Sequence, residues 1–138
     1  MIINFELRVN LADSLTIMNA VPKTILIIED NQDIRENTAE LLEMDGYWVF
    51  TASNGTDGLA MINSIKPDII ICDIVMQDMD GFAVFQSLQN NEETKSIRFI
   101  FSTAQSQKDE IDKAQQMGAT CYLIKPFDER QLIACIEG

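Results

Sequence analysis

The chain has 138 residues, of which 46% are hydrophobic, and this size and composition fit one compact globular domain with a core of its own. Its 10 basic and 22 acidic residues give a formal net charge of −12, which would repel a phosphate backbone, so we expect no direct binding of nucleic acid. Because the chain contains no histidine, Ser-His and Cys-His nucleophiles and His-ligated metals are excluded, and any bound metal must be a hard cation held by oxygen atoms.

The first 22 residues form an N-terminal extension that the later pattern does not explain. They lack a basic start followed by an unbroken apolar block, which a signal peptide would have. A disordered leader, an upstream translation artefact and a short docking helix, capped at Asp13 with Leu15 and Met18 facing inward, are all compatible with this stretch. We expect partial order here, ahead of a domain that spans residues 23–138.

From Lys23 onward, short β-rich runs alternate with segments of helical length. The third and fourth runs are almost continuously apolar rather than alternating, as strands covered on both faces of a parallel sheet should be. We predict five strands: Thr24–Ile28, Tyr47–Thr51, Asp68–Cys72, Ile97–Ser102 and Thr120–Ile124.

Each run is followed by a segment with helix signals. Asn31 or Asp33 can cap the first helix, Asn54-Gly55 opens the second, and Pro67 prevents its continuation. The fourth helix, roughly residues 106–117, has only a thin apolar stripe, so we expect it to be weakly held. Five strands that alternate with five helices predict an α/β fold with a doubly wound parallel sheet.

Polar residues stand where the predicted strands end, and in a doubly wound sheet these ends lie along one edge. They are Glu29 and Asp30 after the first strand, Asp73 after the third, Thr103 and Ala104 after the fourth, and Lys125 after the fifth. Two carboxylates about 4 Å apart repel by on the order of 4 kcal/mol at an effective dielectric constant of about 20, so three together should partly protonate or bind a cation. Mg²⁺ is the natural candidate, because it takes oxygen ligands and is commonly completed by a phosphate oxygen.

Asp73 is the candidate nucleophile of this set. Its carboxylate could attack a phosphoryl donor to form an acyl phosphate, while Mg²⁺ and Lys125 neutralise charge on the phosphoryl oxygens and Thr103 donates a hydrogen bond. The small side chain of Ala104 would leave the approach to Asp73 open.

The strand ends also carry sequence motifs: ED at Glu29-Asp30, DIVMQDMDG from Asp73 to Gly81, STA at Ser102 to Ala104, and YLIKPF from Tyr122 to Phe127. In this order and spacing, over residues 23–138, the chain resembles the receiver domain of bacterial two-component response regulators (CheY-like). The resemblance implies a flavodoxin-like sheet of strand order 2-1-3-4-5. It also implies a phosphorylation-activated signalling switch, not an enzyme beyond its own Mg-dependent self-phosphorylation and self-dephosphorylation.

The resemblance assigns the acceptor and the metal ligands. Asp73 would accept a phosphoryl group from a phosphohistidine on a sensor histidine kinase or a phosphotransfer protein. Mg²⁺ would be bound by Asp30, Asp73 and the backbone carbonyl of Val75, with Glu29 acting through water.

The resemblance also assigns the switch. Thr103, Ala104 and Lys125 would contact the phosphoryl group, Thr103 would shift toward it, and Tyr122 would turn inward. This would reshape the face made by the fourth helix, fifth strand and fifth helix, which would act on a downstream protein target or an attached output domain, or form a phosphorylation-linked homodimer.

The chain departs from the family pattern at two positions. Gln77 stands where proline is usual, four residues after the acceptor, which should loosen the loop. Gly58 stands where alanine is common, at a cost of about 1 kcal/mol of helix propensity.

Two other functions compete with the phosphorylated switch. A phosphatase of the haloacid dehalogenase type would need a DxD motif after the first strand, where this chain has ED. A receiver-like protein-binding module that works without phosphorylation lacks no required residue and is the main alternative.

The cysteines and the hydropathy pattern suggest where the protein works. Cys72, Cys121 and Cys135 are odd in number and lack CxxC spacing, so we expect free, buried thiols in a reducing compartment. No run approaches the roughly 18 consecutive apolar residues of a membrane span, so we expect a cytoplasmic protein without membrane contact.

Overall fold

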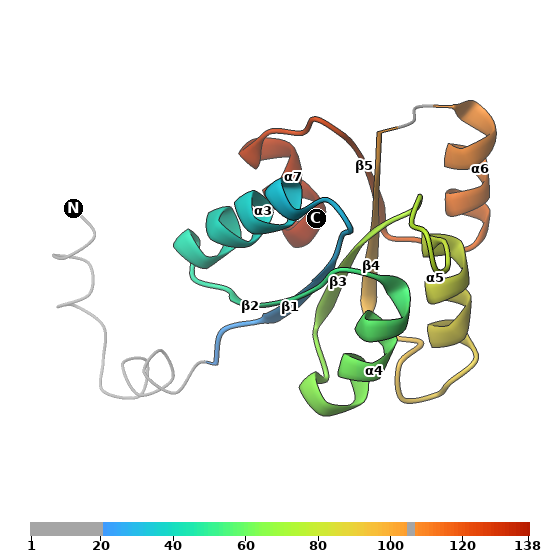
Figure 1. The fold of residues 1–138 in the computed structure, drawn as a ribbon, viewed down its shortest axis with the longest axis horizontal. Coiled ribbons are helices and arrows are strands. Elements are labelled where there is room, and N and C mark those ends of the chain that lie inside the picture. The colour runs from blue at the N-terminus through green and yellow to red at the C-terminus, as the bar shows by residue number, and fades with distance from the viewer. Residues whose placement is uncertain (1–20, 105–106) are drawn as a thin grey trace, which may run out of the picture.

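The computed structural model describes residues 21–104 and 107–138 (Figure 1). Their strands form one five-stranded parallel sheet in the order β2-β1-β3-β4-β5, which confirms the predicted fold. The strands are β1 (Thr24–Ile28), β2 (Trp48–Ala52), β3 (Ile69–Asp73), β4 (Arg98–Thr103) and β5 (Cys121–Ile124). Every strand end lies within one residue of its predicted position.

A helix follows each strand. The helices are α3 (Gln32–Met44), α4 (Gly55–Ile65), α5 (Gly81–Gln89), α6 (Lys108–Gln116) and α7 (Glu129–Glu137). Four of them are capped by a side-chain oxygen that accepts a hydrogen bond from a first-turn backbone N–H; the caps are Asn31, Asn54, Asp80 and Asp128. The exception is α6, which lacks such a side-chain cap. Since a cap contributes about 1 kcal/mol, α6 begins less firmly than the other helices.

The three central strands are buried on both faces, which explains their apolar runs. All four isoleucines and leucines from Ile25 to Ile28 in β1 are at most 2% exposed. Parallel pairing sets Leu26 beside Ile70, and Ile70 beside Phe99, so apolar side chains lie side by side across the sheet.

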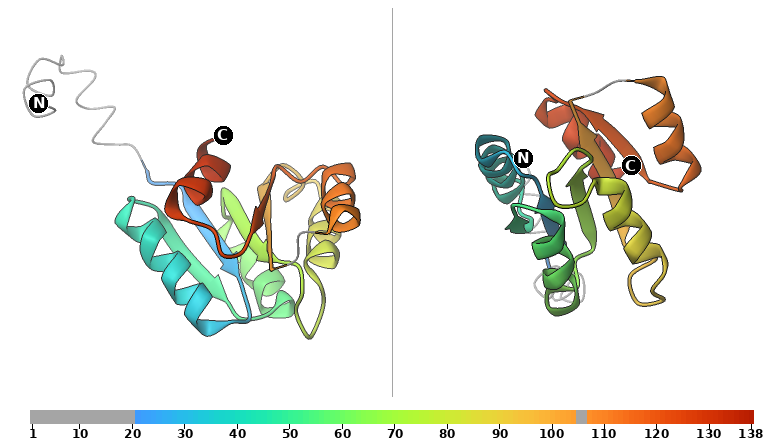
Figure 2. Two further views of the ribbon diagram at one scale, coloured as in Figure 1. Left: turned by 90° about the horizontal axis from the view of Figure 1, so that it is seen from above. Right: turned by 45° about the vertical axis from the view of Figure 1, so that its right-hand side comes forward.

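The helices cover both faces of the sheet, so the core has two layers. In Figures 1 and 2, α3 and α7 lie on one face and α4, α5 and α6 lie on the other. Leu42 of α3 and Leu132 of α7 belong to the first layer, and Val84 of α5 belongs to the second. Four phenylalanines with neighbouring ring centroids 4.8 to 5.6 Å apart pack in the second layer: Phe82, Phe85, Phe99 and Phe101.

The prediction of three free thiols is wrong for two of the cysteines. Cys121, the first residue of β5, forms a disulfide with Cys135 in the last turn of α7, with their Cα atoms 5.7 Å apart. The chain returns antiparallel to β5 through α7, and this return brings together two residues 14 positions apart that no CxxC motif links. Cys72 is free and buried, as predicted.

The expected partial order at the N-terminus concerns residues 1–22, of which 1–20 lie outside the described part of the chain. Among the residues that the structure describes, none of the helices combines the length and the hydropathy needed to cross a membrane.

Candidate functional site

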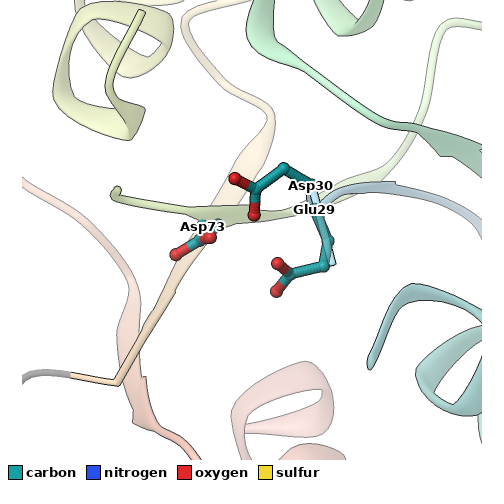
Figure 3. Close-up of side chains that lie close together, drawn as sticks. All are labelled: Glu29, Asp30 and Asp73. Carbon is teal, nitrogen blue, oxygen red and sulfur yellow. The ribbon is translucent and has the colours of Figure 1, made fainter. Parts of the chain in front are cut away.

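Three carboxylates meet at the carboxyl edge of the sheet (Figure 3). Glu29 follows β1 and is 2% exposed, Asp73 is the last residue of β3 and is 5% exposed, and Asp30 is open to solvent. One carboxylate oxygen from each residue lies within 4.8 Å of the other two. The sequence therefore predicted correctly which acidic residues the fold brings together.

Lys125 places its ammonium group between two of these acids. Its Nζ forms an ion pair with Glu29 and lies 3.4 Å from Oδ2 of Asp73. The lysine follows β5, and its backbone N–H donates to the carbonyl of Thr103 at 2.7 Å, which extends the sheet pairing by one residue. This hydrogen bond fixes where the lysine leaves the sheet.

Glu29 is held by the start of α3. Its Oε2 accepts a hydrogen bond from the backbone N–H of Asn31 at 3.1 Å, and its carbonyl accepts one from Nη1 of Arg35 at 2.8 Å. The sequence motifs did not point to this role of Arg35, since an arginine one turn into a helix is an ordinary surface residue. The turn between β1 and α3 brings Arg35 close to the carbonyl of Glu29, and the sequence does not show the shape of this turn.

Asp73 is poised between its charged and neutral forms. Oδ1 accepts a hydrogen bond from the backbone N–H of Val75 at 3.3 Å. Burial, and next the negative charge of Glu29, raise the pKa of Asp73 from 3.8 to about 7, although Lys125 opposes the shift. This agrees with the expectation that three adjacent acids would partly protonate.

Gly81 allows the loop after β3 to fold back against Asp73. A Cβ atom at Gly81 would lie 2.4 Å from the backbone carbonyl oxygen of Asp73, too close for any other residue. The N–H of Gly81 donates to the carbonyl of Ile74 at 2.8 Å, and Asp80 caps α5 directly after the loop. The glycine is needed at this contact.

The donor set fits a hard cation. It consists of carboxylate oxygens, two of the three acids are buried, and one lysine balances only part of their charge. Oxygen donors with a residual negative charge are the environment that Mg²⁺ prefers. The predicted carbonyl ligand Val75 follows Asp73 by two residues, and its side chain is 54% exposed.

The predicted switch residues lie beside this centre. Thr103, the last residue of β4, is fully buried, Ala104 next to it is exposed, and Tyr122 in β5 is partly buried. The hydroxyls of Tyr122 and Thr103 both donate to Oε1 of Glu110, at 2.8 Å and 3.3 Å. Burial, and next the hydrogen bond to Glu110, raise the pKa of Tyr122. Glu110 belongs to none of the sequence motifs at the strand ends, so no motif pointed to it.

Most of the chain matches one known protein family. The family model of the response regulator receiver domain matches residues 25–137, a range that includes every residue of this centre. The chain belongs to the response regulator receiver family. It is thus a signalling domain of a two-component system, in which the signal is carried by phosphorylation.

Curated relatives match the chain over most of its length. It is 36% identical over 114 residues to protein PilH of Pseudomonas aeruginosa, covering 83% of this chain and 94% of PilH. It is 33% identical over 104 residues to sporulation initiation phosphotransferase F of Bacillus subtilis, covering 75% and 82%. It is 38% identical to the phosphate regulon transcriptional regulatory protein PhoB of Pseudomonas aeruginosa, of which the chain spans 52%.

Solved receiver structures share the fold. The chemotaxis response regulator CheY4 of Vibrio cholerae superposes with a TM-score of 0.80 at 26% identity, covering 85% of this chain and 98% of CheY4. A response regulator receiver domain protein from Clostridium thermocellum gives a TM-score of 0.77 at 31% identity, covering 83% and 91%.

The receiver has an apolar hollow beside Lys125. A cavity of about 470 Å³ is lined by one face of α3 and by the loop that joins β5 to α7. Ile34 and Leu41 contribute from α3, Pro126 and Phe127 from the loop, and Ala104 also lines the cavity. An apolar surface thus lies directly beside the charged centre.

Proposed function

We propose that Asp73 is the phosphoacceptor of a phosphorylation-activated switch. A phosphohistidine on a sensor histidine kinase or a phosphotransfer protein donates the group. An Asp73 carboxylate oxygen forms the new O–P bond as the P–N bond of the donor breaks, and the histidine nitrogen keeps the electron pair and takes up a proton.

The proposal rests on the charged groups that surround the Asp73 carboxylate. Its carboxylate lies at the end of a buried strand, 3.4 Å from a lysine and within 4.8 Å of two further acids. Glu29, Asp30, Asp73 and the carbonyl of Val75 would hold Mg²⁺. When bound, the ion would neutralise negative charge on the carboxylates and on the phosphoryl oxygens.

The other residues act on the phosphoryl group. Lys125 supplies a positive charge that already lies between Glu29 and Asp73. The Thr103 hydroxyl donates a hydrogen bond to a phosphoryl oxygen. The side chain of Ala104 is small and exposed, so the approach to Asp73 stays open. The lysine and the hydroxyl are placed where negative charge gathers on the phosphoryl oxygens during transfer, so they stabilise the transferring group beside Asp73.

The apolar hollow between α3 and the β5–α7 loop is a suitable docking place for the donor. A phosphohistidine must come within bonding distance of Asp73, so its carrier has to cover the surface that surrounds Lys125. Ile34, Leu41 and Phe127 offer apolar contacts at this place.

The output face is formed by α6, β5 and α7. Of the residues in α6, only Ala114 is buried, whereas α7 buries Leu132, Cys135 and Ile136. A helix with so little buried apolar surface can shift at a low cost, which suits a two-state element biased by a local charge change. The shifted face would contact a downstream protein, an attached output domain or a second copy of the domain.

Incubation with Mg²⁺ and acetyl phosphate tests the proposal. The parent should gain the mass of one phosphoryl group, and hydroxylamine should remove it because the product is an acyl phosphate. Asp73→Asn should gain none. Asp68→Asn, which makes the same chemical change just before the opposite end of β3, should behave as the parent. A parent that gains no mass, and gives no spectral change with beryllofluoride, would favour a binding module that works without phosphorylation.

A further inference from the structure

Glu110, in the first turn of α6, connects the two residues of the predicted switch. A single oxygen, Oε1, accepts hydrogen bonds from the Tyr122 hydroxyl at 2.8 Å and from the Thr103 hydroxyl at 3.3 Å. Thr103 is fully buried, and Glu110 and Tyr122 are partly buried. The three side chains thus form one network, with the carboxylate of Glu110 as the shared acceptor.

The proton count of this network restricts what Thr103 can do. A threonine hydroxyl carries one proton and can donate it to one acceptor at a time. While Thr103 donates to Glu110, that proton cannot go to a phosphoryl oxygen on Asp73. The carboxylate and the phosphoryl group are therefore rival acceptors for the same proton.

The same hydrogen bonds hold α6 on the sheet. This helix buries only Ala114 and has no side-chain cap. The ammonium group of Lys113 lies 4.3 Å from the centre of the Phe82 ring, a contact that joins α6 to α5 rather than to the sheet. Loss of the bond from Thr103 to Glu110 would thus remove the hydrogen bond that joins the first turn of α6 to the end of β4.

We propose that Glu110 is a positioning residue that holds Thr103 and Tyr122 in the resting arrangement and competes with the phosphoryl group for the Thr103 hydroxyl. The inference rests on the proposed phosphorylation of Asp73 and adds the residue that opposes the active state. Because coupling between two sites is reciprocal, the bond that weakens phosphoryl binding is itself weakened by phosphorylation, which frees the start of α6.

Three variants on α6 test this role. Glu110→Ala removes the acceptor and suits a helix, so the fold should be kept. Glu110→Gln keeps an uncharged acceptor oxygen, and a hydrogen bond to a neutral acceptor is weaker. Asp109→Ala removes the same charge from the neighbouring position of the first turn, where the side chain is exposed.

The affinity for beryllofluoride in the presence of Mg²⁺ is the first readout, because this anion mimics the phosphoryl group. Glu110→Ala should bind it on the order of 5- to 10-fold more tightly than the parent. Glu110→Gln should fall between the two, and Asp109→Ala should match the parent. The Thr103 methyl resonance is the second readout. In Glu110→Ala without ligand it should move toward the position that the parent reaches with beryllofluoride.

Unchanged or weaker binding by Glu110→Ala, an unmoved Thr103 resonance, or an equal effect of Asp109→Ala would each overturn the role of Glu110. Failure of the proposed function looks different: the parent itself would then bind beryllofluoride no better than Asp73→Asn. Should the alanine variant unfold, Glu110→Gln gives the same decision, because parent values in both readouts would contradict the proposal.

Discussion

Binding of Mg²⁺ should release a proton from Asp73, and the amount released should fall as the pH rises. The pKa of Asp73 in the metal-free protein is raised from 3.8 to about 7, first by burial and then by the charge of Glu29. A cation binds the deprotonated carboxylate, so a proton that is present must leave.

The raised pKa sets the size of the effect. With a pKa of about 7, Asp73 is about 90% protonated at pH 6 and about 10% protonated at pH 8. Binding should therefore release about 0.9 proton per ion at pH 6 and about 0.1 proton at pH 8. The apparent affinity should rise about tenfold per pH unit below pH 7 and level off above it.

Calorimetric titration with MgCl₂ in two buffers that differ in ionisation enthalpy measures the proton count directly. Asp73→Asn serves as the control and should release almost no proton at either pH. Equal release at pH 6 and pH 8 in the parent, or release by Asp73→Asn equal to that of the parent, would refute the assignment of the proton to Asp73.

Three further predictions concern stability. In the folded, metal-free state Asp73 holds its proton more tightly than in the unfolded chain, so the free energy of unfolding should fall by roughly 2 to 4 kcal/mol as the pH rises from about 4 to about 7. Urea unfolding should show this slope, and a flat profile would contradict it. Gly58→Ala would place a Cβ atom 2.5 Å from Cδ1 of Ile28 and should cost about 1 to 3 kcal/mol despite the better helix propensity. Ile28→Val should recover part of this loss in a double-mutant cycle, and additive effects would rule the contact out. Reduction of the Cys121–Cys135 disulfide, which spans a sequence separation of 14 residues, should lower stability by about 3 kcal/mol in guanidinium unfolding, and an unchanged midpoint would argue against the bond.

The sheet and the acidic centre could be read from the sequence because both follow from local rules. Apolar runs mark strands that are buried on both faces, and in a parallel sheet all their carboxyl ends lie on one edge. Polarity changes abruptly after Ile28 and Cys72, so the positions of Glu29 and Asp73 at that edge followed from counting along the chain.

Glu110 could not be found in this way. Three acidic residues, Asp109, Glu110 and Asp112, lie within four positions of α6. The rotation of the helix about its own axis determines which of these three side chains faces β4. A helix that buries only Ala114 has almost no apolar stripe from which this rotation could be read.

The disulfide and the reason for Gly58 depend on tertiary contacts as well. Cys121 and Cys135 meet only because α7 packs back along β5. From the sequence alone, Gly58 only lowers the helix propensity of its segment. In the structure it makes room for Ile28, and the loss is offset by a larger apolar side chain in β1.

Trp48 is the single tryptophan of the chain and the first residue of β2, the edge strand, where it pairs with Thr24 and is 54% exposed. It therefore lies at the end of the sheet that is remote from Asp73. Its intrinsic fluorescence will report on unfolding and on any partner that contacts that outer edge, while changes at Asp73 should leave the emission unchanged. An optical assay of activation for this protein needs a fluorophore introduced near β5.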